Sequence, residues 1–389
     1  MTVTIAHLSD THLGYRAHFR LDTAGRNLRG LDIEQAYART IDSILETGGI
    51  DLVVHTGDVF HQSRPSWSAL LCFITQTQRL AVLNCPVVII AGNHDISQLR
   101  TAETVFSILQ HALPFVTFVA GATDEVIALD VIRTQLVAVP HSALATVEPG
   151  VRLAPDGYRN ILLTHGLAPT LADTPRREAG ETTLTPELLS PGYDAILLGH
   201  FHADERVMAN TWYAGSTERI GWNDADTNPG WSLVTLPDQG PVTVEHISIA
   251  TRPMRDVVVR DAEGRDAREI ADDVLRMARQ SAPEGAMIRA DLTGVERGIR
   301  RSAEGMIRRD AAEEFFWIQT YSRSDQSLIG SETETASRTE PMQGLPQLLR
   351  QYCEEEIADT SYRQHFLTRG LQALEAVIAA ADPPAEVGE

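Results

Sequence analysis

Five short apolar runs recur in the first 200 residues, and polar side chains that can bind a metal ion follow each of them. The runs are VTIAHLS (3–9), DLVVHT (51–56), PVVIIA (86–91), NILLTH (160–165) and DAILLG (194–199). Short β-branched runs of this kind are typical of strands buried on both faces of a sheet. Stretches with helical spacing separate the first three runs, so the pattern predicts an α/β fold.

Capping residues predict where the helices begin and end. LDIEQAYARTIDSILETGG places its apolar residues on one helical face, with Asp32 as the expected N-cap and Gly48 and Gly49 as the stop. Ser66 is the expected N-cap of SWSALLCFITQTQRL. Two later segments, VIALDVIRTQLVAVP and GWSLVTL…VTVEHISI, have the pattern of antiparallel hairpin strands. We therefore expect a mixed arrangement of strands rather than a purely parallel sheet.

The composition bounds the class of protein. With 389 residues, the chain is too long for one ordinary core, so two or three domains are expected. No apolar run is long enough to cross a bilayer, and the N-terminus enters a strand pattern without a signal sequence. The 3 cysteines are scattered, which argues against a disulfide framework or a zinc–thiolate site. These features predict a cytoplasmic protein without membrane contact.

The polar side chains after the five runs have the chemistry of a metal centre. They are Asp10 and His12, Asp58 and His61, Asn93, His94 and Asp95, His165, and His200 and His202, in chain order. The carboxyl ends of strands in an α/β sheet meet at one edge, so these side chains should converge. Carboxylate, imidazole and amide donors without thiolate suit manganese, iron or zinc. They are too many for one ion but enough for two that share a carboxylate, an arrangement that hydrolyses phosphoesters.

The order DxH…GDxxH…GNHD…H…GHxH resembles the calcineurin-like metallophosphoesterase superfamily. Within it, GDVFHQSRPS and YAGSTERIGW…PGWSLV are similar to stretches of the SbcD-type nucleases, the nuclease subunits of DNA double-strand-break repair and meiotic recombination complexes. The likeness is specific over residues 1–235 and loose thereafter. It implies a metallophosphoesterase β-sandwich flanked by helices, with a small α/β cap domain and a C-terminal helical pair.

The predicted domain boundaries combine this resemblance with changes in the sequence pattern. We expect a metallophosphoesterase nuclease domain over 1–250 and a DNA-binding cap domain over 251–321. The polar, nearly non-aromatic stretch 322–344 is predicted to be a flexible linker. Two amphipathic stretches within 345–382 are predicted to be helices that bind a partner.

The resemblance also implies a role for each candidate site residue. One divalent ion, expected to be manganese, would be held by Asp10, His12, Asp58 and His202, and a second by Asp58, Asn93, His165 and His200. His94 would be a catalytic residue beside the scissile phosphate. His61 is not required as a ligand, so we weigh a catalytic role in handling substrate against a structural one. His7 and His55 lie inside strands and are expected to be core residues, whereas His18 is a loop residue facing DNA or solvent.

The charge distribution bears on DNA binding. The formal net charge is −20, yet residues 251–309 hold 13 arginines against 11 acidic residues. The DNA-binding candidates in this stretch are Arg297, Arg300, Arg301, Arg308 and Arg309. Arginine forks bind phosphate oxygens, so the segment could follow a DNA backbone. A solvated helix in which Glu296 and Glu304 balance the charge is the alternative.

The leading functional hypothesis is a manganese-dependent DNA nuclease, acting as an exonuclease, an endonuclease or both in double-strand-break processing. By resemblance, its partners are DNA and an SbcC-like SMC-family ATPase, and it forms a homodimer through the helices predicted over 66–83 and 101–111. The residues that would supply that interface are Leu70, Leu71, Phe73, Ile74, Val105, Phe106, Ile108 and Leu109. Ordinary packing of these helices on the sheet is the alternative. One alternative is a phosphodiesterase or phosphatase for small phosphoesters or phosphoproteins. Another is a DNA-end-binding scaffold whose metal site is silent.

Overall fold

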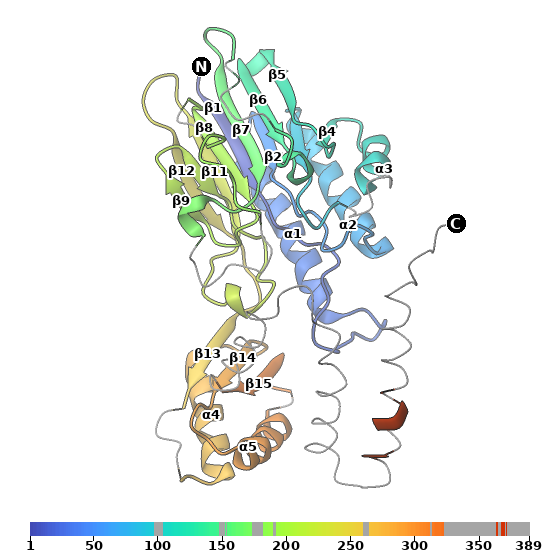
Figure 1. Ribbon diagram of the computed structural model, residues 1–389, viewed down its shortest axis with the longest axis vertical. Coiled ribbons are helices and arrows are strands. Elements are labelled where there is room, and N and C mark those ends of the chain that lie inside the picture. Colours follow the sequence, from blue (N-terminus) through green and yellow to red (C-terminus); the bar gives the residue numbers. More distant parts are fainter. Residues whose placement is uncertain are drawn as a thin grey trace, which may run out of the picture.

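Two six-stranded sheets form the larger part of the computed structural model (Figure 1). The structure describes residues 1–96, 104–147, 152, 154–172, 182–189, 192–259, 264–311, 313–322, 363–364, 367–369 and 371. The first sheet has the order β12-β11-β1-β2-β3-β4. Its strands are β1 (Val3–Leu8), β2 (Leu52–His55), β3 (Val87–Ile90), β4 (Val116–Val119), β11 (Gly230–Leu236) and β12 (Thr243–Ser248).

The second sheet has the order β5-β6-β7-β8-β10-β9. Its strands are β5 (Glu125–Leu129), β6 (Thr134–Val139), β7 (Arg159–His165), β8 (Ala195–Gly199), β9 (Glu205–Met208) and β10 (Thr211–Tyr213). Both sheets are mixed: β5 pairs with β6 and β11 with β12 in antiparallel register, whereas β1, β2, β3 and β4 are parallel. The expected strands and both expected hairpins are therefore present.

The two sheets pack face to face and helices cover the outside of the first. Ile5, Val54 and Leu163 belong to one buried apolar cluster that contains residues of both sheets, which makes the arrangement a β-sandwich. On the outer face, α1 (Leu28–Thr47) and α2 (Trp67–Gln78) pack against β1, β2 and β3, and α3 (Val105–Ala112) packs near β4. These buried runs explain why the strands read as continuous apolar segments rather than alternating ones.

The two predicted helix starts had different outcomes. Ser66 caps α2, because its hydroxyl accepts a hydrogen bond from the backbone nitrogen of Ala69, as expected. The prediction that Asp32 caps the preceding helix was wrong, since Asn27 is the N-cap of α1 and accepts from the nitrogen of Gly30. Asp32 instead lies inside the helix, where its carboxylate receives both ends of the Arg252 guanidinium at 2.6 and 2.7 Å.

A separate three-stranded unit follows the sandwich (Figure 1). Parallel strands β13 (Met254–Val258), β14 (Met287–Asp291) and β15 (Trp317–Tyr321) alternate with α4 (Ala267–Ser281) and α5 (Arg297–Asp310), and the unit has its own apolar core. Asp266 begins α4 with a capping box closed by Glu269. A smaller apolar cluster that includes Trp222, Ala225 and Phe316 joins this unit to the sandwich.

Polar contacts also hold the three-stranded unit against the sandwich. Besides its bond to Asp32, Arg252 donates to the carbonyl of Gly285 and stacks 4.0 Å from the Phe316 ring centroid. Arg20, in the loop before α1, donates to the carbonyls of Phe315 and Phe316. The same loop brings His18 to 4.5 Å from the Trp317 ring centroid, so this histidine packs against the unit instead of standing free in a solvated loop.

Several sequence expectations lie wholly or largely outside the described residues. They concern the linker over 322–344, nearly all of the helical segment over 345–382, and the first residues of the helix predicted over 101–111. Within the described part of the chain, no helix has both the length and the apolar character that a membrane span requires.

Candidate metal centre

The polar side chains after the five apolar runs converge, and they come from both sheets. Strands β1, β2 and β3 of the first sheet lead to Asp10, Asp58 and Asn93, and β7 and β8 of the second lead to His165 and His200. The backbone nitrogen of His200 donates to both oxygens of Asp10, at 3.1 and 3.0 Å. The site is therefore built across the end of the sandwich, where the two sheets face each other.

The backbone is unusual at this junction. Asp10, His12, Asp58 and His200 have φ angles of 50°, 48°, 52° and 102°, a region that non-glycine residues rarely adopt. Such conformations persist where surrounding contacts fix them, and they cluster at functional sites. Here the nitrogens of Asp10 and His12 donate to the carbonyls of Gly57 and Asp58, each at 3.0 Å, so that the loops after β1 and β2 hold each other.

Two groups of candidate ligands form at this junction. Donor atoms of Asp10, His12 and His202 lie within 4.8 Å of one another, and so do those of Asp58, His165 and His200. Asn93 joins the second group, because its Oδ1 lies 2.9 Å from Nε2 of His165 and 3.1 Å from Nδ1 of His200. The structure thus brings together all seven side chains that the sequence singled out as ligands.

Asp58 lies between the two groups. Its Oδ2 is 3.7 Å from Nε2 of His12 in the first group and 3.5 Å from Nε2 of His165 in the second. Burial would raise the pKa of this carboxyl, but His165, His12 and His94 together hold it well below its ordinary value. A side chain on Gly92 would overlap the Asp58 carboxylate, so the approach of the β3 loop requires glycine there.

In the second ligand group, two hydrogen-bond acceptors face each other. Nδ1 of His165 must donate to the carbonyl of Thr56 at 2.7 Å, because a carbonyl can only accept. A neutral ring then carries no proton on Nε2, which faces the amide oxygen of Asn93. Both of these atoms are hydrogen-bond acceptors. Two acceptors at 2.9 Å repel each other unless a proton or a cation lies beside them. The donor set therefore fits a bound cation.

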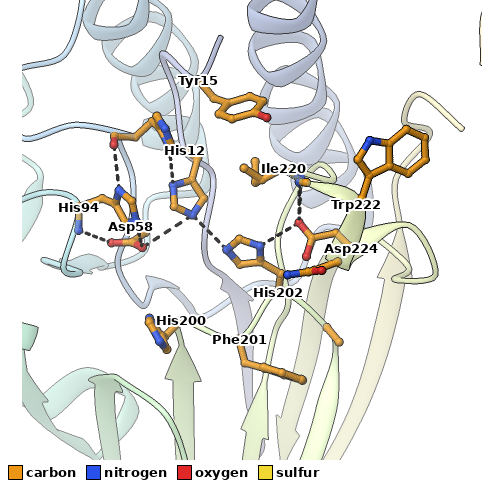
Figure 2. A pocket seen from close by; sticks show the side chains of 14 residues that line it. His12, Tyr15, Asp58, His94, His200, Phe201, His202, Ile220, Trp222 and Asp224 are labelled. Carbon is orange, nitrogen blue, oxygen red and sulfur yellow. Dashed lines mark hydrogen bonds and ion pairs between the residues drawn. The ribbon is translucent and has the colours of Figure 1, made fainter. Parts of the chain in front are cut away.

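In the first ligand group, two ring nitrogens face each other in a similar way. Nδ1 of His202 bonds to the Asp224 carboxylate at 2.9 Å, and Nε2 of His202 faces Nε2 of His12 at 3.2 Å. Both imidazole nitrogens point into the same space, so they can share a proton or bind one cation (Figure 2). In the absence of an ion, burial lowers the pKa of His202, and the Asp224 carboxylate outweighs it and raises the value to about 10.

His94 and His61 lie on one side of these groups. The backbone nitrogen of His94 donates to Oδ1 of Asp58 at 2.9 Å, and Nδ1 of its ring bonds to the carbonyl of His61 at 2.9 Å. This leaves Nε2 of His94 facing the site, 4.0 Å from Asp58. The His61 ring stacks on the His94 ring with centroids 5.2 Å apart. His12, His61 and His94 form a third close group of donor atoms, which the sequence did not predict.

These residues open into a cavity of about 240 Å³ (Figure 2). Of the candidate ligands, His12, Asp58, His200 and His202 line the cavity. His61 and His94 line it as well, and so do Tyr15, Phe201, Ile220 and Trp222. The Tyr15 ring meets His61 edge to face, with centroids 5.0 Å apart. The cavity has room for a phosphate and its immediate substituents but is far too small to admit a whole duplex.

Some residues around the site have roles that the sequence did not predict, and others lie where they were expected. Asp95 was counted among the potential ligands, but its buried carboxylate accepts from the nitrogens of Val59, Phe60 and Gly92 and so fixes the loops after β2 and β3. Asp224 and Tyr15 carried no sequence signal that pointed to the site. His7 and His55 are buried core residues bonded to Thr56 and Thr11, as expected, and burial lowers the pKa of each to about 3.

The arginines proposed to bind DNA lie away from the cavity. They belong to α5, which covers the side of the three-stranded unit remote from the sandwich (Figure 1). Arg297, Arg301, Arg308 and Arg309 are exposed. Arg308 pairs with Glu304 and Arg309 lies 3.3 Å from Asp310, so part of the positive charge is balanced locally.

A helix-flanked β-sandwich whose strand ends present two carboxylate-bridged groups of histidine and aspartate is the framework of a metal-dependent phosphoesterase. The family model of the calcineurin-like phosphoesterases matches residues 3–204, a range that contains all seven candidate ligands. The chain therefore belongs to the calcineurin-like phosphoesterase family.

The chain is also similar to curated proteins named DNA double-strand break repair protein Mre11. The protein from Haloferax volcanii is 30% identical over 295 residues, which are 75% of this chain and 61% of that protein. The one from Methanosarcina mazei is 28% identical, covering 64% and 39%. That from Saccharolobus solfataricus is 26% identical, covering 70% and 71%. The matched part of the chain thus spans 61% and 39% of the first two relatives, less than two thirds of each.

A solved structure, the NAD nucleotidase NadN of Haemophilus influenzae, aligns with 64% of this chain and 50% of its own. Its TM-score is 0.33 at 12% identity, a likeness too low to carry an argument about fold or function.

Proposed function

We propose that this protein is a manganese-dependent DNA nuclease that hydrolyses phosphodiester bonds during double-strand-break processing. The observation that carries the proposal is the arrangement of two ligand groups on either side of Asp58, with Nε2 of His94 beside them in one cavity. The similarity to the Mre11 proteins supports DNA as the substrate.

In this proposal, each ligand group holds one divalent ion. Asp10, His12 and His202 would hold the first, and Asn93, His165 and His200 would hold the second, with Asp58 between the two groups. When bound, the two ions supply the activation of a water molecule and the neutralisation of charge on the phosphate. Thr56 orients His165 by accepting from its Nδ1 atom. Mixed oxygen and imidazole donors without thiolate suit manganese, iron or zinc, and manganese is the ion that we propose.

His94 completes the proposed chemistry. Its ring is held by the carbonyl of His61, and Nε2 faces the cavity with the side chain 31% exposed, enough to reach substrate. From this position it can stabilise the phosphate or hold a proton for the leaving oxygen. The alternative, a phosphodiesterase or phosphatase for small phosphoesters, uses the same residues. The two functions differ in substrate and not in the site.

Digestion of end-labelled linear duplex DNA by the full-length protein tests the proposal. We expect shortened products with manganese and none when a chelator is added. A small chromogenic phosphodiester is assayed in parallel. Efficient cleavage of the small ester together with no cleavage of single-stranded or duplex DNA would favour the small-molecule phosphodiesterase and contradict the nuclease.

The His61→Ala variant is expected to separate DNA from small esters. His61 stacks on His94 and lines the cavity without being required by either proposed ion, so its loss should leave metal binding intact. The rate on duplex ends should fall by about 10- to 100-fold, and the rate on the small ester by less. Parallel rates on both substrates check this. Equal losses would assign His61 a structural role.

Neutralising Arg297, Arg301 and Arg309 together should weaken DNA binding and flatten its dependence on salt. All three are exposed on α5, and arginines that neutralise phosphates release counterions. A loss of about 0.9 in the slope of log Kd against log salt is expected for each contact removed. Fluorescence anisotropy with labelled duplex measures the slope. An unchanged slope would remove α5 from the interface.

The proposal extends to partners. The sequence expectation of a dimer interface needs correction in part, because Phe73, Phe106 and Leu109 are buried in the apolar cluster between the helices and the first sheet. Leu71 and Ile108 are exposed, at 66% and 60%, together with Trp67 at 87%. These residues remain available for a homodimer contact. We further propose that residues 251–321 act as a DNA-binding cap, that the segment 345–382 binds an SbcC-like ATPase after the linker 322–344, and that the protein is cytoplasmic.

A further inference from the structure

The loop 220–224 runs along the cavity beside His202 (Figure 2). Within it, Asp224 is 5% exposed and its Oδ2 accepts three hydrogen bonds. The donors are Nδ1 of His202 at 2.9 Å and the backbone nitrogens of Ile220 at 2.8 Å and Gly221 at 3.2 Å. One oxygen therefore fixes both the turn of the loop and the orientation of the imidazole ring.

The loop is itself held from both ends. After Asp224, the nitrogen and hydroxyl of Thr227 bond to the Asp224 carbonyl at 2.9 and 2.8 Å. Before it, Trp222 lies under the guanidinium of Arg289, whose Cζ is 4.9 Å from the ring centroid. Arg289 belongs to β14 of the three-stranded unit and is paired with Asp256 through two hydrogen bonds. The carboxylate is thus presented to His202 by a fixed support.

The hydrogen bond to Asp224 determines which ring nitrogen of His202 faces the other ligands of the first group. Because the carboxylate accepts from Nδ1, Nε2 is the nitrogen that faces His12, 3.2 Å away. Without this bond, the ring could rotate or place its proton on the nitrogen that faces the cavity. Carboxylates that accept from the second nitrogen of a metal-binding histidine set its tautomer and raise its affinity as a ligand.

We propose that Asp224 is a positioning residue that presents Nε2 of His202 to the ion proposed between Asp10, His12 and His202. This inference rests on the proposed two-metal function. It adds a residue outside the matched family range 3–204 to the machinery of the site. Asp224 does not reach the second ligand group directly, so its effect should be confined to one of the two ions.

The test is calorimetric titration of manganese chloride into the metal-free full-length protein and its variants. Asp224→Ala removes the acceptor, whereas Asp224→Asn keeps an oxygen that can accept the same three hydrogen bonds but removes the charge. Asp226→Asn is the matched control, because Asp226 is an exposed acid of the same segment. Thermal unfolding of each variant reports whether the fold is retained.

In the unaltered protein we expect two manganese ions per chain. With Asp224→Ala, one binding step should weaken by about 10- to 100-fold while the other changes by less than about twofold. Asp224→Asn should fall between Asp224→Ala and the unaltered protein, and Asp226→Asn should match the unaltered protein. Two unchanged steps in Asp224→Ala, or equal weakening of both, would overturn the positioning role alone. Fewer than two ions in the unaltered protein would overturn the two-metal function and this inference together.

Discussion

Replacing Asn93 by alanine is expected to leave one metal ion bound and to lower the rate of phosphodiester hydrolysis by about 1,000-fold or more. Asn93 Oδ1 lies 2.9 and 3.1 Å from ring nitrogens of His165 and His200, so its removal opens the second ligand group. One ion of a pair contributes several kcal/mol to stabilising charge in the transition state, and each 1.36 kcal/mol is a factor of about ten in rate.

Metal content and hydrolysis are to be measured on the same samples of the Asn93→Ala variant. Asn228→Ala is a suitable control, because Asn228 is exposed and bonds only to the Ser248 hydroxyl among the contacts described for it. Full occupancy by two ions together with normal activity would show that Asn93 is not a ligand. Loss of the fold can be recognised independently from the thermal transition.

His94→Ala should give the opposite combination, with both ions retained and the chemical step lost. The His94 ring belongs to neither proposed ligand group, although one of its nitrogens lies within 4.8 Å of a donor atom of His12. Its Nδ1 bonds to the His61 carbonyl, and its Nε2 lies 4.0 Å from the Asp58 carboxylate. Its removal should therefore spare the ions and lower the rate by about 100- to 10,000-fold, the contribution usual for a positioned acid or base.

The same paired measurements decide the role of His94. His111→Ala serves as a matched control, since His111 is exposed on α3 and its ring bonds to the carbonyl of Ser107. If His94→Ala loses a metal ion, His94 belongs among the ligands and the proposed division of roles is wrong. If it keeps both ions and full activity, His94 has no part in the reaction.

The convergence of the candidate ligands could be predicted from the sequence for a physical reason. Strands buried on both faces must be continuous apolar runs, and a ligand can only follow where such a run ends, so Asp10, Asp58 and His165 are marked locally. The same local information placed Ser66 at the start of α2. It could not show that β1 and β7 lie in different sheets, because pairing between distant strands is decided by the packing of the whole sandwich.

The features that the sequence did not reveal depend on contacts between distant segments. Asp32 has a side chain suited to an N-cap, but Asn27 is the N-cap of α1. Asp32 instead forms an ion pair with Arg252, which is 220 residues further along the chain. Asp224 is 22 residues from the histidine it contacts, in a segment without a local metal-binding pattern. Such supporting residues are chosen by three-dimensional proximity, so spacing along the chain does not mark them.

The central claim, that Asp58 joins two metal ions, is tested most directly by anomalous diffraction. Crystals of the full-length protein grown with manganese would be measured at the manganese absorption edge. The account predicts two anomalous peaks about 3.5–4 Å apart, on either side of the Asp58 carboxylate. One should lie against Asp10, His12 and His202, and the other against Asn93, His165 and His200. A single peak at full occupancy, or a pair of peaks that does not include Asp58, would contradict it.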